Sequence, residues 1–350
     1  MTIPKAALLS LLPFLPGSHA WGTLGHDTVA FIAQNFISSS TATWAKTLLN
    51  DSSPAYLANV ATWADSYRYT SEGAFSAPFH YIDAADDPPT SCNVDYDRDC
   101  GAEGCVVSAL ANYTVRVKSA SVSTAEKQKA LKWIIHFVGD IHQPLHDEAL
   151  DVGGNTINVT FAGTGTNLHH IWDSNMPEKL IGGYSLTDAK NWASNLTAEI
   201  KTGGYKSEAA GWLSGIDENK PDGKATSLLW AKDANAYVCS TVVPQGADAV
   251  RGKELEGAYY DKAIPVIEMQ IAKAGYRLAA WLNVLAMGKV GLKVRKEEYD
   301  HGYGHGNGRR GAGTVVQAVR VESRDEERIM MARRARAAYG WNCGPEGHAH

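Results

Sequence analysis

Residues Ala125–His142 read AEKQKALKWIIHFVGDIH, and the apolar side chains of this segment recur at spacings of three and four. This periodicity predicts a helix with one buried face. Five other segments share it: His26–Ile37, Ala58–Tyr69, Val106–Val117, Leu186–Ile200 and Tyr259–Leu285. The segment Asn155–Phe161 alternates instead, which predicts a short β-hairpin. The sequence therefore predicts an all-α fold, a mainly helical single domain with one hairpin.

Histidine and aspartate are paired at helical spacing. His136 and Asp140 lie four residues apart, so both project from one face of the predicted helix. His169 and Asp173 repeat the spacing, and His146 lies between the two pairs. An imidazole nitrogen and a carboxylate oxygen on one helix face can bind a single cation, and zinc accepts both types of ligand. The spacing therefore predicts a metal centre.

A surface hydrogen bond is the commoner reason for such a pair. The apolar neighbours of His136 argue against it, because an imidazole and a carboxylate buried without partners would be costly. Asp65, in WADSYR, and His80, in FHYID, are further candidate ligands. His142 is predicted to be structural, because Pro144 ends the helix between His142 and His146.

The first twenty residues have the pattern of a secretory signal peptide. Lys5 precedes the apolar stretch Ala6–Leu15, and Ser18 and Ala20 are small residues before a cut at Trp21. The apolar stretch is shorter than the roughly 20 residues that span a membrane. We therefore expect residues 1–20 to be removed and the protein to be secreted.

Other features agree with export. Glycosylation sequons begin at Asn112, Asn158 and Asn195, with a weaker one at Asn50. Four cysteines form an even set that predicts two disulfides in an oxidising compartment: Cys92, Cys100, Cys105 and Cys239. Cys343 is left over near the C-terminus.

The charge of the chain changes near Gly288. Residues 289–350 hold 12 Lys and Arg against 8 Asp and Glu, so the rest of the chain carries a formal charge of −9. Apolar periodicity fades there too, which predicts a low-order C-terminal extension after a single domain over 21–288. Two origins of the extension remain open, a flexible charged segment or a gene-model artefact. The acidic remainder argues against nucleic-acid binding by a basic surface alone, and bound metal would supply positive charge.

The motifs, taken in order, resemble those of the S1/P1 nucleases, a family of secreted zinc nucleases. The matching residues are Trp21-Gly-x-x-Gly-His26, Trp63-Ala-Asp65, His80-Tyr-Ile-Asp83, His136-Phe-Val-Gly-Asp140-x-x-Gln-Pro-Leu-His146-Asp-Glu, Gly153-Gly-Asn and Asn167-Leu-His169-x-x-Trp-Asp173. The resemblance extends from Trp21 to about Leu285. It implies a fold similar to that of zinc-dependent phospholipase C and pairs Cys92 with Cys239 and Cys100 with Cys105.

The resemblance also implies three zinc ions per chain. The first would be held by Asp65, His80, His136 and Asp140. The second would use the α-amine and carbonyl of Trp21 together with His26 and Asp140, and the third His146, His169 and Asp173. Zinc lowers the pKa of bound water from about 15.7 to about 7.

Four residues receive roles by the same resemblance. Asp65 would orient the attacking water, and Arg68 would stabilise charge on phosphorus. Tyr81 would stack on a nucleobase, and Asp83 would hydrogen-bond its edge. Stacking requires an unpaired base, which favours single strands.

The implied activity is hydrolysis of single-stranded DNA and RNA to 5′-phosphorylated products, with 3′-nucleotidase activity. The expected partners are nucleic acid and 3′-nucleotides, with no stable protein partner and no membrane, and the protein is expected to be a monomer. Two alternatives remain: a zinc-dependent phospholipase C-like phosphodiesterase, whose metal site would be nearly the same, and a non-enzymatic secreted metal-binding protein.

Overall fold

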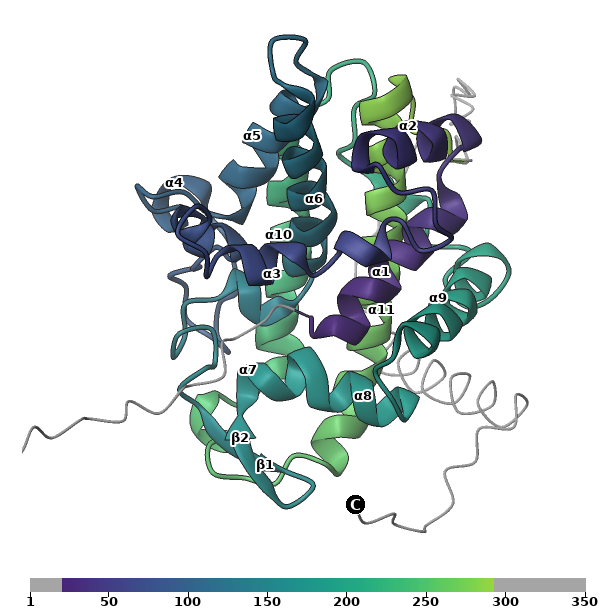
Figure 1. Cartoon of the computed structure of the whole chain (residues 1–350). Coiled ribbons are helices and arrows are strands. Elements are labelled where there is room, and N and C mark those ends of the chain that lie inside the picture. The colour runs from purple at the N-terminus through teal and green to yellow at the C-terminus, as the bar shows by residue number, and fades with distance from the viewer. Residues whose placement is uncertain (1–20, 293–350) are drawn as a thin grey trace, which may run out of the picture.

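The computed structural model describes residues 21–292 (Figure 1). Its α-helices are α1 (Thr23–Phe36), α2 (Ser39–Leu49), α3 (Trp63–Tyr67), α4 (Tyr96–Asp99), α5 (Val106–Lys118), α6 (Thr124–Asp140), α7 (Leu168–His170), α8 (Met176–Ile181), α9 (Leu186–Lys201), α10 (Gly223–Tyr237) and α11 (Ala258–Met287). Short 3-10 or π turns are η1 (Ala58–Val60), η2 (Ala74–His80), η3 (Pro144–Asp147), η4 (Ile171–Asn175), η5 (Gly211–Leu213), η6 (Val238–Val242) and η7 (Ala247–Ala249). The strands are β1 (Asn158–Phe161) and β2 (Thr164–Asn167). The prediction of a mainly helical protein with one hairpin is confirmed.

Some predicted features lie outside the described residues. These are the signal peptide over residues 1–20, residues 293–350 of the C-terminal extension, and Cys343. Within residues 21–292, the helices lack the length and apolar character that crossing a membrane requires.

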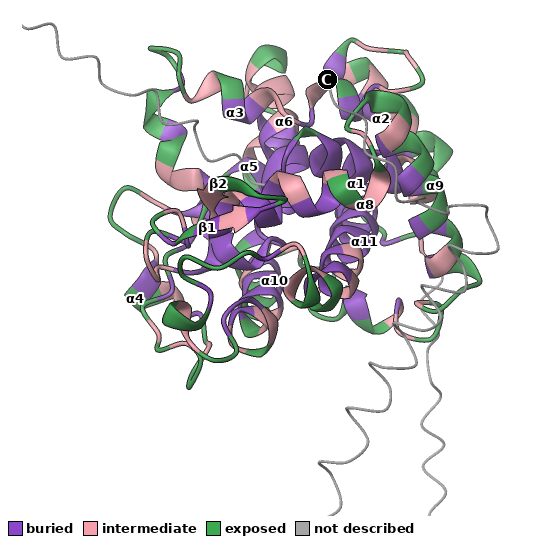
Figure 2. Cartoon of the chain, turned by 90° about the horizontal axis from the view of Figure 1, so that it is seen from below, coloured by how far each residue is buried: buried purple, intermediate pink, exposed green. Residues whose placement is uncertain are grey.

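Helix α11 forms the centre of the fold. Every residue from Gln270 to Leu285 is buried, which is the pattern of a helix packed on all sides. Helix α1 packs against α11 and α9, and Figure 2 shows buried residues concentrated where α1 and α11 meet. A Cβ atom on Gly275 would lie 2.4 Å from the Cβ of Ile32. The absence of a side chain at Gly275 therefore permits the close approach of α1 and α11.

Helix α6 carries the segment with which the sequence analysis began. The hydroxyl of Ser123 accepts a hydrogen bond from the main chain of Glu126 and begins the helix. The helix ends at Asp140, two residues before the predicted end at His142. Pro144 explains the difference, because a residue before proline avoids the helical region and Gln143 is extended (φ −91°, ψ 117°). Figure 1 shows α5 beside α6, and these two helices are in contact.

The predicted helices differ from the structure in several places. The expected helix over Ala58–Tyr69 is divided into η1 and α3 by Thr62, whose backbone (φ −99°, ψ 5°) leaves the helical region. Helices α2 and α10 were not predicted. Helix α2 begins with a hydroxyl cap from Ser38, and α10 with a carboxylate cap from Asp222. Such caps satisfy main-chain N–H groups at the start of a helix and so stabilise it.

The β-hairpin directly precedes α7, the helix that carries His169. Strands β1 and β2 are antiparallel, and Asn158 is opposite Asn167. Ala162 and Gly163 connect them with positive φ angles of 53° and 74°, as a two-residue hairpin turn requires. The predicted strand began at Asn155, but Asn155 and Thr156 belong to a turn and the strand starts at Asn158. Helix α7 follows β2 directly and carries His169.

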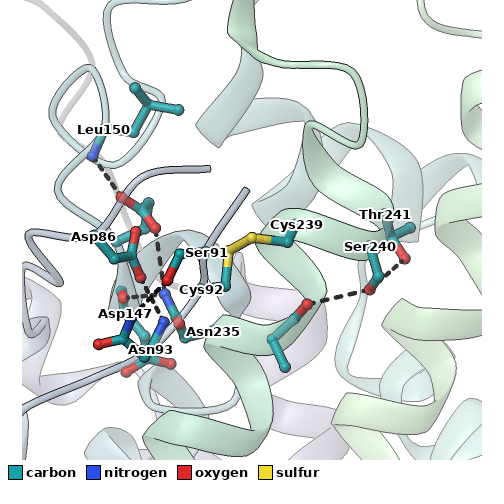
Figure 3. The surroundings of a disulfide bond; sticks show 12 residues. Asp86, Ser91, Cys92, Asn93, Asp147, Leu150, Asn235, Cys239, Ser240 and Thr241 are labelled. Atoms are coloured by element: carbon teal, nitrogen blue, oxygen red, sulfur yellow. Dashed lines mark hydrogen bonds between the residues drawn. A yellow bond between two sulfur atoms is a disulfide. The ribbon is translucent and has the colours of Figure 1, made fainter. Parts of the chain in front are cut away.

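Both disulfides form as the resemblance implied. Cys92 bonds to Cys239, and Cys100 bonds to Cys105. The first bond joins η6, which follows α10, to a loop 147 residues away, beside a group of acidic side chains (Figure 3). In the chain-entropy description, closing so long a loop stabilises the folded state by roughly 5 kcal/mol.

Candidate metal centre

Two clusters of buried His and Asp side chains lie close together. The Asp140 cluster consists of His26 from α1, Asp65 from α3, His80 from η2, and His136 and Asp140 from α6. The Asp173 cluster consists of His146 from η3, His169 from α7 and Asp173 from η4. All eight side chains are buried. The fold thus brings together every His and Asp that the sequence analysis proposed as a metal ligand.

Asp140 lies at the centre of its cluster. Its Oδ1 atom is 3.2 Å from Nε2 of His26 and 3.2 Å from Nε2 of His136. Its Oδ2 atom is 3.0 Å from Nδ1 of His80. The Oδ1 atom of Asp65 is 3.5 Å from Nε2 of His136 and 3.8 Å from Nδ1 of His80. Because both oxygens of Asp140 face imidazoles, this carboxylate can bridge two cations.

Hydrogen bonds to the main chain set the orientation of the imidazoles. Nδ1 of His136 lies 2.6 Å from the carbonyl oxygen of Ala61, and it must carry the proton because a carbonyl only accepts. Nε2 of His136 faces the carboxylates. Burial lowers the pKa of His136, but Asp140 and Asp65 outweigh it and raise the pKa to about 10, so without a cation this nitrogen holds a proton that a metal ion would displace. Burial alone would raise the pKa of Asp140, but His136, His26 and His80 outweigh it and hold the pKa well below the usual value. Asp140 is therefore charged.

The Asp173 cluster has the same chemistry. Nδ1 of His146 donates to the carbonyl oxygen of His80 at 2.7 Å, and Nδ1 of His169 donates to that of Gly153 at 2.6 Å. The two Nε2 atoms are 3.0 Å apart, and Nε2 of His169 is 3.1 Å from Oδ2 of Asp173. Burial, together with His169, lowers the pKa of His146 to about 4, so this imidazole is neutral near neutral pH.

These contacts test whether the residues fit a metal. In each cluster, imidazole nitrogens face one another or a carboxylate at about hydrogen-bond distance. Such an arrangement requires a shared proton or a cation between the acceptors. In the described protein, Oδ2 of Asp173 and both ring nitrogens of His26 have no partner with hydrogen-bond geometry. The buried nitrogen and oxygen atoms therefore fit a centre for several divalent cations.

Glycines let the main chain approach the clusters. A Cβ atom on Gly139 would lie 2.7 Å from Nδ1 of His26, so the α6 backbone can pass His26 only without a side chain. Gly153 has a φ of +58°, and a Cβ there would lie 2.7 Å from the carbonyl oxygen of Leu145. The sequence analysis quoted both glycines in motifs without a role. It also missed the carbonyl acceptors, because a carbonyl carries no sequence signal.

Trp21 lies just before the start of α1, and His142 lies outside both clusters. Trp21 is buried, and the next residue, Gly22, donates its main-chain N–H to the carbonyl oxygen of Asp173 at 2.8 Å. The start of α1 is thus tied to the Asp173 cluster. His142 belongs to neither cluster, as predicted: its Nδ1 donates to Val138 and its Nε2 accepts from Arg277.

A sequence profile described as S1/P1 Nuclease matches residues 21–287. The chain belongs to the S1/P1 nuclease family. It is 56% identical to Nuclease S1 of Aspergillus oryzae over 282 residues, which cover 81% of this chain and 96% of that protein. It is 54% identical to Nuclease P1 of Penicillium citrinum over 263 residues, 75% of this chain and 97% of that protein. Endonuclease 4 of Arabidopsis thaliana is 32% identical over 289 residues, with coverages of 79% and 93%.

In this S1/P1 nuclease, Arg68 follows α3 near the Asp173 cluster. Its guanidinium donates to the hydroxyl of Tyr69 at 2.8 Å and lies 4.9 Å from the centre of that ring. Burial lowers the pKa of His169, but Asp173 outweighs burial and the pKa is raised overall; the positive charge of Arg68 opposes this rise. Arg68 is therefore close enough to act electrostatically on this cluster.

Tyr81 and Asp83 lie on the segment that follows His80. They alternate with Ile82, which is fully buried, so both project from the opposite side of the extended chain. The side chain of Tyr81 is 38% exposed. Partial burial and the neighbouring Asp99 raise the pKa of Asp83. An exposed aromatic ring and a carboxyl group thus stand on one side of the chain, next to a cluster residue.

Proposed function

We propose that this S1/P1-type nuclease hydrolyses single-stranded DNA and RNA to 5′-phosphorylated products and also acts on 3′-nucleotides. Membership of the family makes the chain a hydrolase of phosphodiester bonds. The observation that carries the proposal is the convergence of eight buried His and Asp side chains in two adjoining clusters. The names of the fungal relatives, Nuclease S1 and Nuclease P1, agree with it.

Three zinc ions would occupy the two clusters. Asp65, His80, His136 and Asp140 would hold the first. His26 and Asp140 would hold the second with the α-amine and carbonyl of Trp21, and His146, His169 and Asp173 the third. Zinc supplies Lewis acidity for the phosphoryl oxygens and lowers the pKa of bound water. Support comes from the mixed nitrogen and oxygen donors, which are ligands that zinc accepts.

Two side chains of the protein would act on the reacting groups. The carboxylate of Asp65 would accept a hydrogen bond from the attacking water and thereby orient its lone pair toward phosphorus. The guanidinium of Arg68 would donate to phosphoryl oxygens as negative charge builds on them. The nearness of Arg68 to the Asp173 cluster supports this role.

Tyr81 and Asp83 would select the substrate. A ring that is partly exposed can stack on a base, and stacking contributes about 1–3 kcal/mol per base. A base within a duplex is already stacked on its neighbours, so an unpaired base is favoured. Asp83 would hydrogen-bond the edge of the same base.

The setting of the enzyme is also proposed. We assign a signal peptide to residues 1–20, the catalytic domain to 21–288 and an extension to 289–350. One hydrophobic core that includes residues from Trp21 to Val290 and the family match over 21–287 support the domain assignment. The two disulfides and the likeness to Nuclease S1 fit a secreted protein. We therefore propose that the protein is secreted, and we propose separately that it is a monomer.

The decisive experiment uses the purified secreted protein with a defined single-stranded DNA oligonucleotide. Product ends are identified by mass spectrometry, before and after removal of metal with a chelator. We expect 5′-phosphate ends, loss of cleavage on chelation, and recovery with zinc. Ends that carry 3′-phosphate, or cleavage that survives removal of metal, would contradict the proposed function.

A further inference from the structure

Gln143 is a fully buried amide at the junction of the two clusters. It follows the end of α6 and caps η3, the turn that carries His146. Its Oε1 atom accepts a hydrogen bond from the main-chain N–H of Leu145 at 2.6 Å. Its Nε2 atom donates to Oδ1 of Asp173 at 2.6 Å. One side chain thus links the turn that carries His146 to the carboxylate of the Asp173 cluster.

The orientation of this amide is dictated by its two neighbours. The N–H of Leu145 can only donate, so it requires the oxygen end of the amide. The carboxylate of Asp173 can only accept when ionised, so it requires the nitrogen end. A flipped amide would place oxygen against oxygen and N–H against N–H. Gln143 therefore has a single orientation in which both bonds form.

The same bond fixes which carboxylate oxygen remains available. With Oδ1 of Asp173 engaged by Gln143, Oδ2 faces Nε2 of His169 at 3.1 Å and has no hydrogen-bond donor among the described residues. The main chain of Asp173 is held separately by the N–H of Gly22. The backbone and the carboxylate of this residue are thus held by two independent donors, both of which come from other elements.

We propose that Gln143 is a positioning residue for the metal of the Asp173 cluster. Its amide holds Oδ1 of Asp173, so that Oδ2 points toward the space between His146 and His169. The inference rests on the proposed function, because it assigns Gln143 to a metal that function requires. Groups that orient metal ligands commonly change metal affinity by about 10- to 100-fold when they are removed. Gln143 should therefore control the occupancy of one zinc site and leave the Asp140 cluster intact.

A purely structural role is the competing explanation, and Gln270 provides a matched control. Gln270 is also fully buried, and its Nε2 donates to the carbonyl oxygen of His142 at 3.1 Å. Its amide contacts no residue of either cluster among its described hydrogen bonds. Gln270→Met and Gln143→Met each remove one buried amide and keep a side chain of similar length. Only Gln143→Met removes a donor to a proposed zinc ligand.

The experiment measures zinc per chain in the secreted proteins after dialysis against increasing chelator concentrations. Wild type and Gln270→Met should release their weakest zinc at the same chelator concentration. Gln143→Met should release one zinc at a free-zinc concentration about 10- to 100-fold higher than wild type and retain the others. If Gln143→Met does not fold, Gln143→Asn is used, because it keeps the amide but is one methylene too short to reach both partners. This variant should release the same zinc at a lower chelator concentration than wild type.

The outcomes separate the two proposals. If wild type binds no zinc, the proposed function and the role of Gln143 both fail. If wild type binds three zinc ions and a folded Gln143 variant retains all three at wild-type affinity, only the role of Gln143 is overturned. Equal loss of zinc from the Gln143 and Gln270 variants would also overturn it, because the effect would then follow from weakened packing.

Discussion

Asp140 and Asp147 are seven residues apart and fully buried, yet they have opposite protonation behaviour. Three imidazoles surround Asp140 and hold its pKa well below the usual value, against the effect of burial. Burial raises the pKa of Asp147 well above the usual value, and Asp140, Glu148 and Asp233 add to the rise. Both oxygens of Asp147 lack a hydrogen-bond partner among the described residues.

The comparison shows that the surroundings of a buried aspartate can favour either its ionised or its protonated form. The carboxylate of Asp140 faces imidazole nitrogens that favour its ionised form, and an ionised carboxylate can bind cations. Asp147 lies near other carboxyl groups, such as that of Glu148, beside the Cys92–Cys239 disulfide (Figure 3), and this environment favours its protonated form. Buried acids are therefore not equivalent evidence for a metal site. The neighbours of each carboxyl group decide.

The largest expected difference is between Asp140→Asn and Asp147→Asn. Asp140→Asn removes a charge that would bridge two zinc ions, so kcat/KM on single-stranded DNA should fall on the order of 10³-fold. Asp147→Asn changes a carboxyl group that belongs to neither cluster, so this variant should bind zinc like wild type and keep an activity close to that of wild type. Initial rates and zinc content of both purified variants check this. Equal loss of activity in the two variants would remove the contrast.

The second largest effect concerns the proposed zinc ion that Trp21, His26 and Asp140 would hold. A variant with one extra residue before Trp21 replaces the α-amine with an amide, which cannot serve as an amine ligand. We expect fewer than three tightly bound zinc ions and loss of most activity. Zinc content and initial rates of the intact secreted protein, with its N-terminus verified by sequencing, measure the effect. Full activity of this variant would show that the α-amine is dispensable.

The smallest effect concerns the buried acidic residues Asp147 and Glu148. Burial raises the pKa of Glu148 from its ordinary 4.5 to about 8 in the folded protein. Between these two pH values the folded state holds a proton that the unfolded state has released. The free energy of unfolding should therefore fall as pH rises from about 5 to 8, by about 1 kcal/mol per pH unit from this group. Glu148→Gln should remove that dependence.

Denaturant unfolding of wild type and Glu148→Gln at several pH values provides the measurement. Glu103→Gln, at an exposed position, is the control and should keep the wild-type slope. Parallel pH profiles for wild type and Glu148→Gln would mean that Glu148 is ionised in the folded protein. Glu148 would then be charged in the folded protein, as Asp140 is.

Local sequence patterns predicted most of the helical fold. Apolar spacing predicted five of the helices, because apolar residues recur every three to four positions in a helix with one buried face: α1, α5, α6, α9 and α11. Helix α10 was missed because its sequence, GKATSLLWAKDANAY, has a weak apolar stripe and depends on its cap and its packing. The division between η1 and α3 was missed because Thr62 leaves no local signal of a break.

The sequence by itself determined which residues could bind metal. Helical spacing places His136 beside Asp140, and the motifs that extend from Trp21 identify the family. Only the tertiary structure decided how these residues act. The carbonyl groups of Ala61, His80 and Gly153 select the imidazole nitrogen that faces the centre. Charges from distant segments likewise give Asp140 and Asp147 different pKa values, because electrostatic interactions depend on distance in space and not on separation along the chain.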